Sequence, residues 1–111
     1  MGGEFIVTQT TNFNQRTPDA TVLSDGRVLV TWAGENPGFG QDIWGRIFNT
    51  DGSVAGDEFL LNDLQDGNQT LPDVSAAGDG FVVSWISDLT FDTSTDPFIA
   101  GAIFDSNLNP V

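Results

Sequence analysis

The feature that most constrains this chain is an internal duplication that runs through its 111 residues. Residues 2–55 align with residues 56–111. The shared motifs are Glu4-Phe5 with Glu58-Phe59, Asn14-Gln15 with Asn68-Gln69, Pro18-Asp19 with Pro72-Asp73, Asp25-Gly26 with Asp79-Gly80, Trp32 with Trp85, Gly45 with Gly101, and Ile47-Phe48 with Ile103-Phe104. A period of about 55 residues is close to that of propeller-blade repeats, which need neighbours to cover their hydrophobic faces. The sequence therefore predicts one module, 1–111, built from two copies of the same unit.

Each half contains four short runs typical of β-strands and no window with helical spacing. The runs are residues 4–8, 19–23, 27–33 and 43–49, then 58–62, 73–77, 81–87 and 99–105. The segments 28–30 and 81–83 are apolar without alternation, as expected of strands covered on both faces. We therefore predict an all-β fold of two four-stranded antiparallel blades of the β-propeller type.

The connections between the predicted strands alternate between short and long. Asp25-Gly26 and Asp79-Gly80 predict tight hairpin turns, because this dipeptide accommodates positive φ angles. The long connections are residues 9–18, 34–42, 63–72 and 88–98. Alternate loops of an antiparallel meander emerge at the same edge, so all four should line one face, and loops on a rigid scaffold are where binding usually resides.

The order of strands at the termini predicts self-association. Each half begins with a strand that would be the outermost strand of the preceding blade, so the second blade lacks its own. Residues 4–8, of the same chain or of another copy, would supply it. Propellers contain about 4 to 8 blades, so two blades cannot close a ring. We expect a homo-oligomer that completes the propeller, with a trimer as the working model.

Charge and composition exclude several classes of function. The chain has three Lys and Arg residues against sixteen Asp and Glu residues, a net charge of -13. Such a surface repels nucleic acids and anionic membranes, and no apolar run is long enough for insertion. Without Cys or His, thiol or histidine nucleophiles and histidine metal sites are excluded. We predict a non-enzymatic protein, although its carboxylates leave glycoside hydrolysis as a remote alternative.

The motifs also resemble those of a known group of proteins. Gly-Gly-Glu-Phe, Asn-Gln-x-x-Pro-Asp, Asp-Gly-x-Val-x-Val-x-Trp and Ile-x-Gly-x-Ile-Phe are similar to tandem repeats of very large secreted RTX-type bacterial proteins and adhesins. This resemblance covers essentially the whole chain and implies a secreted, extracellular β module that is a fragment of a larger protein. The chain departs from the pattern after Trp32 and Trp85, and it lacks the RTX calcium nonapeptide, so that calcium chemistry is not carried over.

Residues that differ between the halves are candidates for ligand binding. Trp44 aligns with Ala100, and Arg46 aligns with Ala102. Trp44 could stack on a sugar ring or anchor a partner surface, and the alternative is that it fills a gap in its own blade. Arg46 would assist binding or neutralise neighbouring carboxylates.

Two further groups of polar residues are candidate ligands. The amides of Asn14, Gln15, Asn68 and Gln69 recur at loop ends, where they would hydrogen-bond a sugar or cap loop backbone. Asp88, Asp92 and Asp96 lie in one loop and offer hard oxygen ligands for Ca²⁺, unless they are simply solvated. The predicted function is binding of glycans or a cell-surface protein by the loop-lined face; the alternative is a structural spacer, which calcium would make rigid.

Overall fold

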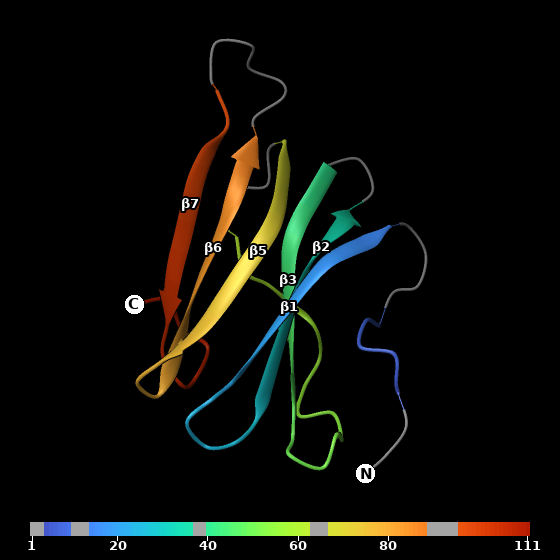
Figure 1. Ribbon diagram of the computed structural model, residues 1–111, viewed down its shortest axis with the longest axis vertical. Helices are drawn as coiled ribbons and strands as arrows, with labels where there is room; N and C mark the ends of the chain where they lie inside the picture. The colour runs from blue at the N-terminus through green and yellow to red at the C-terminus, as the bar shows by residue number, and fades with distance from the viewer. Residues whose placement is uncertain (1–3, 10–13, 37–39, 63–66, 89–95) are drawn as a thin grey trace.

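The computed structural model describes residues 4–9, 14–36, 40–62, 67–88 and 96–111 (Figure 1). Its strands form a four-stranded sheet of order β1-β2-β3-β4 and a three-stranded sheet of order β5-β6-β7, both antiparallel. The strands are β1 (Gln15–Val22), β2 (Val28–Asn36), β3 (Gly40–Phe48), β4 (Phe59–Leu60), β5 (Asn68–Ala77), β6 (Gly80–Asp88) and β7 (Phe98–Phe104). The prediction of an all-β, antiparallel fold is confirmed.

Two details of the strand prediction are wrong. Residues 4–8 form no strand, and of residues 58–62 only Phe59 and Leu60 pair. These two residues pair with β3 as the outer strand of the first sheet, as predicted, and the second sheet has three strands in the described chain because residues 4–8 do not complete it. The first strand of each sheet also begins earlier than predicted. A β-bulge at the proline interrupts the pairing only locally, so the strand extends on both sides of it. The pairing register shifts between Arg16 and Asp19, and Thr17 has φ 52°. The second sheet repeats this bulge, with Leu71 at φ 54°.

The matching registers define twin residues, which occupy equivalent positions in the two sheets. Asp19 pairs with Thr31 in the first sheet, and Asp73 pairs with Ser84 in the second. Trp32 lies opposite Trp44, as Trp85 lies opposite Ala100. The structure thus confirms that Ala100 is the twin of Trp44.

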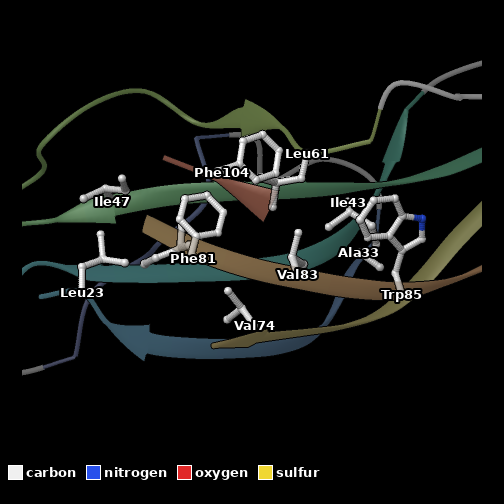
Figure 2. Close-up of a cluster of buried hydrophobic side chains, with 11 residues drawn as sticks. Leu23, Ala33, Ile43, Ile47, Leu61, Val74, Phe81, Val83, Trp85 and Phe104 are labelled. Atoms are coloured by element: carbon white, nitrogen blue, oxygen red, sulfur yellow. The ribbon is translucent and has the colours of Figure 1, made fainter. Parts of the chain in front are cut away.

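The hydrophobic core lies between the two sheets, and its side chains come from both (Figure 2). Leu29 and Ile43 of the first sheet are fully buried, as is Val83 of the second. The rings of Phe81 and Phe104 stack with centroids 4.9 Å apart. Each large apolar side chain buried here contributes about 1.5–3 kcal/mol to folding. From the apolar runs at 28–30 and 81–83, Leu29, Phe81 and Val83 supply the contact between the sheets. Val82 is 36% exposed on the opposite face, so the prediction that both faces of this strand are covered is wrong in the described chain.

Hydrogen bonds from β5 to β1 join the sheets at one end of each. The amide of Val74 donates to Asp19 Oδ2 at 2.8 Å, and the amide of Ala76 donates to Thr21 Oγ1 at 3.2 Å. The Val74 bond holds the pKa of Asp19 below its ordinary value. By contrast, the neighbouring Asp19 carboxylate, by hydrogen bonding and by charge repulsion, raises the pKa of Asp73.

We expect Asp73→Asn to raise the melting temperature of dilute protein at pH 7. Because folding raises the pKa of Asp73, ionisation of this group disfavours the folded state above its unfolded pKa, near 3.8. The gain should vanish as the pH falls through that value, where wild-type Asp73 is protonated. Asp57→Asn, which removes an exposed charge elsewhere, is the control. Equal melting curves for the two variants at pH 7 would contradict the expectation.

Candidate functional site

One edge of the molecule collects the strand ends that lead into the predicted long loops. Asn14 and Glu35 meet there, with Asn14 Nδ2 donating to Glu35 Oε1 at 3.1 Å and the Glu35 amide donating to the Asn14 carbonyl at 3.0 Å. Asn68 joins the second sheet to the first, since its Oδ1 accepts from the Gln41 amide at 3.0 Å. Asp88 lies opposite Asn68 in the register. We call this the loop edge, and it places polar groups of both sheets side by side.

The two predicted glutamine sites have the same structural role. Trp32 Nε1 donates to Gln15 Oε1, and Trp85 Nε1 donates to Gln69 Oε1, both at 2.9 Å. Each bond satisfies the polar end of a buried indole. This shared contact gives a structural reason for the repetition of both residue types. Trp32 and Trp85 are both buried, as predicted, but only Trp85 belongs to the core between the sheets, whereas Trp32 lies on the outer side of the first sheet.

Trp44 and Arg46 lie on the same side of β3, two residues apart, but in different environments. Trp44 is partly buried, and its indole lies close to Gly34 near the loop edge. The Arg46 guanidinium donates to two carbonyls, Nη1 to Val7 at 2.9 Å and Nε to Gly56 at 3.0 Å. Arg46 therefore fastens the N-terminal segment, residues 4–9, to the first sheet. Of the two, Trp44 is the one placed near the loop edge.

The predicted calcium ligands are only partly described. Asp88 ends β6 and Asp96 lies just before β7, where Ser87 pairs with Phe98, so both belong to the loop edge. Asp92 lies outside the described residues, and the hypothesis of a three-aspartate site is therefore untested. Within the described residues, no group of three acidic side chains is close enough to hold a metal ion. No helix in that part of the chain could span a membrane.

Sequence reasoning missed a buried polar pair below the loop edge. Asp42 is fully buried on β3 and accepts from Asn62 Nδ2 at 3.0 Å, and Asn62 Oδ1 accepts from the Ile43 amide at 2.7 Å. Asn62 therefore takes the place of a strand partner where β4 has ended. Neither residue stands in a recognisable motif, so no sequence signal could have found this pair.

The structure also contains an apolar cavity of about 130 Å³ between the N-terminal segment and the first sheet. Val7, Val30, Pro18 and Trp32 contribute to its walls. It lies on the side of the first sheet that faces away from the second sheet.

Comparison with known proteins adds no assignment to these features. No family model matches the chain, and comparisons with curated proteins and with solved structures give no significant match.

Proposed function

We propose that this chain is a non-enzymatic, propeller-type repeat module that binds carbohydrate at its loop edge. The observation that carries the proposal is that the long-loop strand ends of both sheets meet at one edge, beside the partly exposed Trp44. Sugars are recognised by aromatic stacking combined with polar side chains, and this edge offers both. The absence of Cys and His from the sequence supports a non-enzymatic role.

The propeller-type arrangement is supported by the geometry of the repeat. Each sheet is an antiparallel meander, and its first strand lies beside the first strand of the other sheet, as at the axis of a propeller. The secreted location is proposed on the resemblance to RTX-type repeats alone. A protein segment is the alternative occupant of the loop edge.

A glycan array with three proteins tests the binding function. We expect wild type to retain a selective set of glycans and Trp44→Ala to bind them about 10-fold more weakly, the size of one lost stacking contact. Trp44→Phe, which keeps an aromatic ring, should bind nearly as well as wild type. All three must show the same folded circular dichroism spectrum.

Val54→Ala provides the control at the opposite edge, where Val54 lies exposed in the turn after β3. Its array should equal that of wild type. An array without selective glycans, or one unchanged by Trp44→Ala, would rule out carbohydrate binding at this site.

A further inference from the structure

The two sheets carry the same apolar residues on equivalent faces, but only the first sheet has that face covered by a neighbouring sheet. The second sheet covers the facing side of the first sheet completely, since Leu29 and Ile43 there are 0% exposed and Ile47 is 4% exposed. We call this the joining face. Their twins on the second sheet are Val82, Ile99 and Ile103, as the matching registers show. These are 36%, 73% and 54% exposed.

The exposed twins form a contiguous apolar surface on β6 and β7, which we call the open face. A surface of Val and Ile side chains on adjacent strands is expected to be covered by a partner. The joining face shows what covers such a surface in this fold, because there it packs against Val83 and Trp85 of the next sheet (Figure 2). The partner of the open face should therefore carry residues equivalent to Val83 and Trp85.

The first sheet carries those residues on its outer side. Val30 and Trp32 are the twins of Val83 and Trp85, and they line the 130 Å³ apolar cavity. In the contact within the chain, Ile43 lies near Trp85 (Figure 2). Ile99, the exposed twin of Ile43, has the matching position on the open face. The cavity of one copy thus has the apolar lining and the matching position to receive Ile99 of another.

The edge of the second sheet requires the same partner. β4 pairs along β3, and the Phe59 ring lies so close to Gly45 that a Cβ there would be 3.2 Å from it. Along β7, residues 98–102 have no strand partner on their outer side in the described chain. A Cβ on Gly101, the twin of Gly45, would meet only atoms of β6. Gly45 thus leaves room for the Phe59 ring, and in the described chain no aromatic ring occupies the equivalent space beside Gly101.

The N-terminal segment is the counterpart of the segment that carries β4. In the duplication, Phe5 matches Phe59. The Phe5 ring packs against the Phe48 ring, with centroids 5.2 Å apart, and Arg46 hydrogen-bonds the same segment. The Phe5 side chain nevertheless remains 56% exposed. β7 lies at the far side of the molecule from this segment (Figure 1), so a chain cannot place Phe5 on its own Gly101 without releasing these contacts.

At the other end of the sheets, polar acceptors that are used in the first sheet also have twins in the second sheet that, among the described residues, receive no such bond. Asp19 and Thr21 accept amide hydrogens from β5, whereas no amide from another sheet donates to their twins, Asp73 and Ser75, in the described chain. The amides at the matching positions of β1 belong to Ala20 and Val22, the twins of Val74 and Ala76.

We infer that copies of this chain associate head to tail, with the open face and β7 edge of one copy receiving the outer side of the first sheet and the N-terminal segment of the next. Ile99 enters the apolar cavity, and Phe5 covers Gly101 while its segment pairs with β7. The contact is heterologous, and a heterologous contact forms a ring when the rotation between successive copies is a whole fraction of a full turn. About two to four copies would give the 4 to 8 blades of a propeller. Trp44 lies opposite Trp32 on the same outer side of the first sheet, so it borders this contact. The contact is nevertheless tested separately from carbohydrate binding, because assembly is measured without ligand.

Light scattering coupled to size exclusion tests the contact through three chains. Wild type should elute as a discrete oligomer at concentrations of about 100 µM. Ile99→Asp and Phe5→Asp should each weaken assembly about 100-fold or more, as expected of a charge placed at the centre of an interface. Both side chains are largely exposed in one chain, so each variant should remain folded.

Mixing the two variants tests the direction of the contact. Each retains one intact half of the interface, so a head-to-tail contact yields a one-to-one complex that neither variant forms alone. A symmetric contact, in which each copy uses the same surface, would yield none. Val54→Asp is the control. The twin of Val54, Pro110, stays exposed although the two sheets of one chain are in contact, so Val54 should stay exposed in the contact between copies and the variant should assemble like wild type.

A folded wild-type monomer at about 100 µM would overturn the inference. So would wild-type assembly of Ile99→Asp, or a mixture of the two variants that stays monomeric. Glycan binding by a monomer would leave the proposed function standing while removing the head-to-tail contact.

Discussion

Phe81→Ala is expected to lower the free energy of unfolding by about 3 to 5 kcal/mol, the largest single effect in the core. Phe81 is 1% exposed and stacks on Phe104, so truncation removes both buried apolar area and an aromatic pair. The surrounding side chains come from both sheets, which limits how far the cavity can collapse. Urea denaturation followed by Trp fluorescence measures the change.

Two variants calibrate this result. Phe81→Leu keeps most of the volume and should lose less than half as much as Phe81→Ala. Val54→Ala truncates an exposed side chain and should change the free energy of unfolding by no more than about 0.5 kcal/mol. A loss below about 1 kcal/mol for Phe81→Ala would show that the two sheets do not share one core.

Asn62→Ala should destabilise the fold by about 2 to 4 kcal/mol, although it removes few apolar atoms. The substitution leaves the buried Ile43 amide without its acceptor and takes one hydrogen-bond donor from the fully buried Asp42 carboxylate. Unsatisfied buried polar groups retain the cost of their desolvation, and this cost is greater for a charge.

The matched control is Asn49→Ala, which removes an exposed amide that donates to Ser53 Oγ. It should cost about 0.5 kcal/mol. A double-mutant cycle with Asp42→Ala isolates the pair, because coupled neighbours are not additive. If Asn62→Ala costs no more than Asn49→Ala in urea denaturation, water replaces the amide and the pair does not fix the path of the chain below the loop edge.

The sequence predicted the repeated parts of this protein well. Trp32 and Trp85 are buried as predicted, and the turn at Asp25-Gly26 has Gly26 at φ 92°. At the second turn, the positive φ of 56° belongs to Gly78. Gly80 is required for another reason, since a Cβ there would collide with the Phe104 carbonyl oxygen. Spacing located this turn, but only the neighbouring strand shows which glycine serves which purpose.

The candidate binding residues were less predictable. Trp44 and Arg46 look alike in the sequence because both lack a twin, yet Trp44 lies near the loop edge and Arg46 is held by two backbone carbonyls. Gln15 and Gln69 were proposed as ligands, and each accepts a hydrogen bond from a tryptophan. Side-chain partners that are distant in sequence decide such roles, and no local pattern contains them.

By itself, the amino-acid sequence determined the duplication, the all-β class, the hairpin turns and the residue types that form the core, because these depend on local conformational preference and on the spacing of apolar residues. Only the tertiary structure decided which copies of the repeated residues are buried. Ile43 and Ile99 are the same residue type at the same repeat position, but one is 0% and the other 73% exposed. Burial is a property of a pair of surfaces, and the second surface is visible only when the sheets have packed.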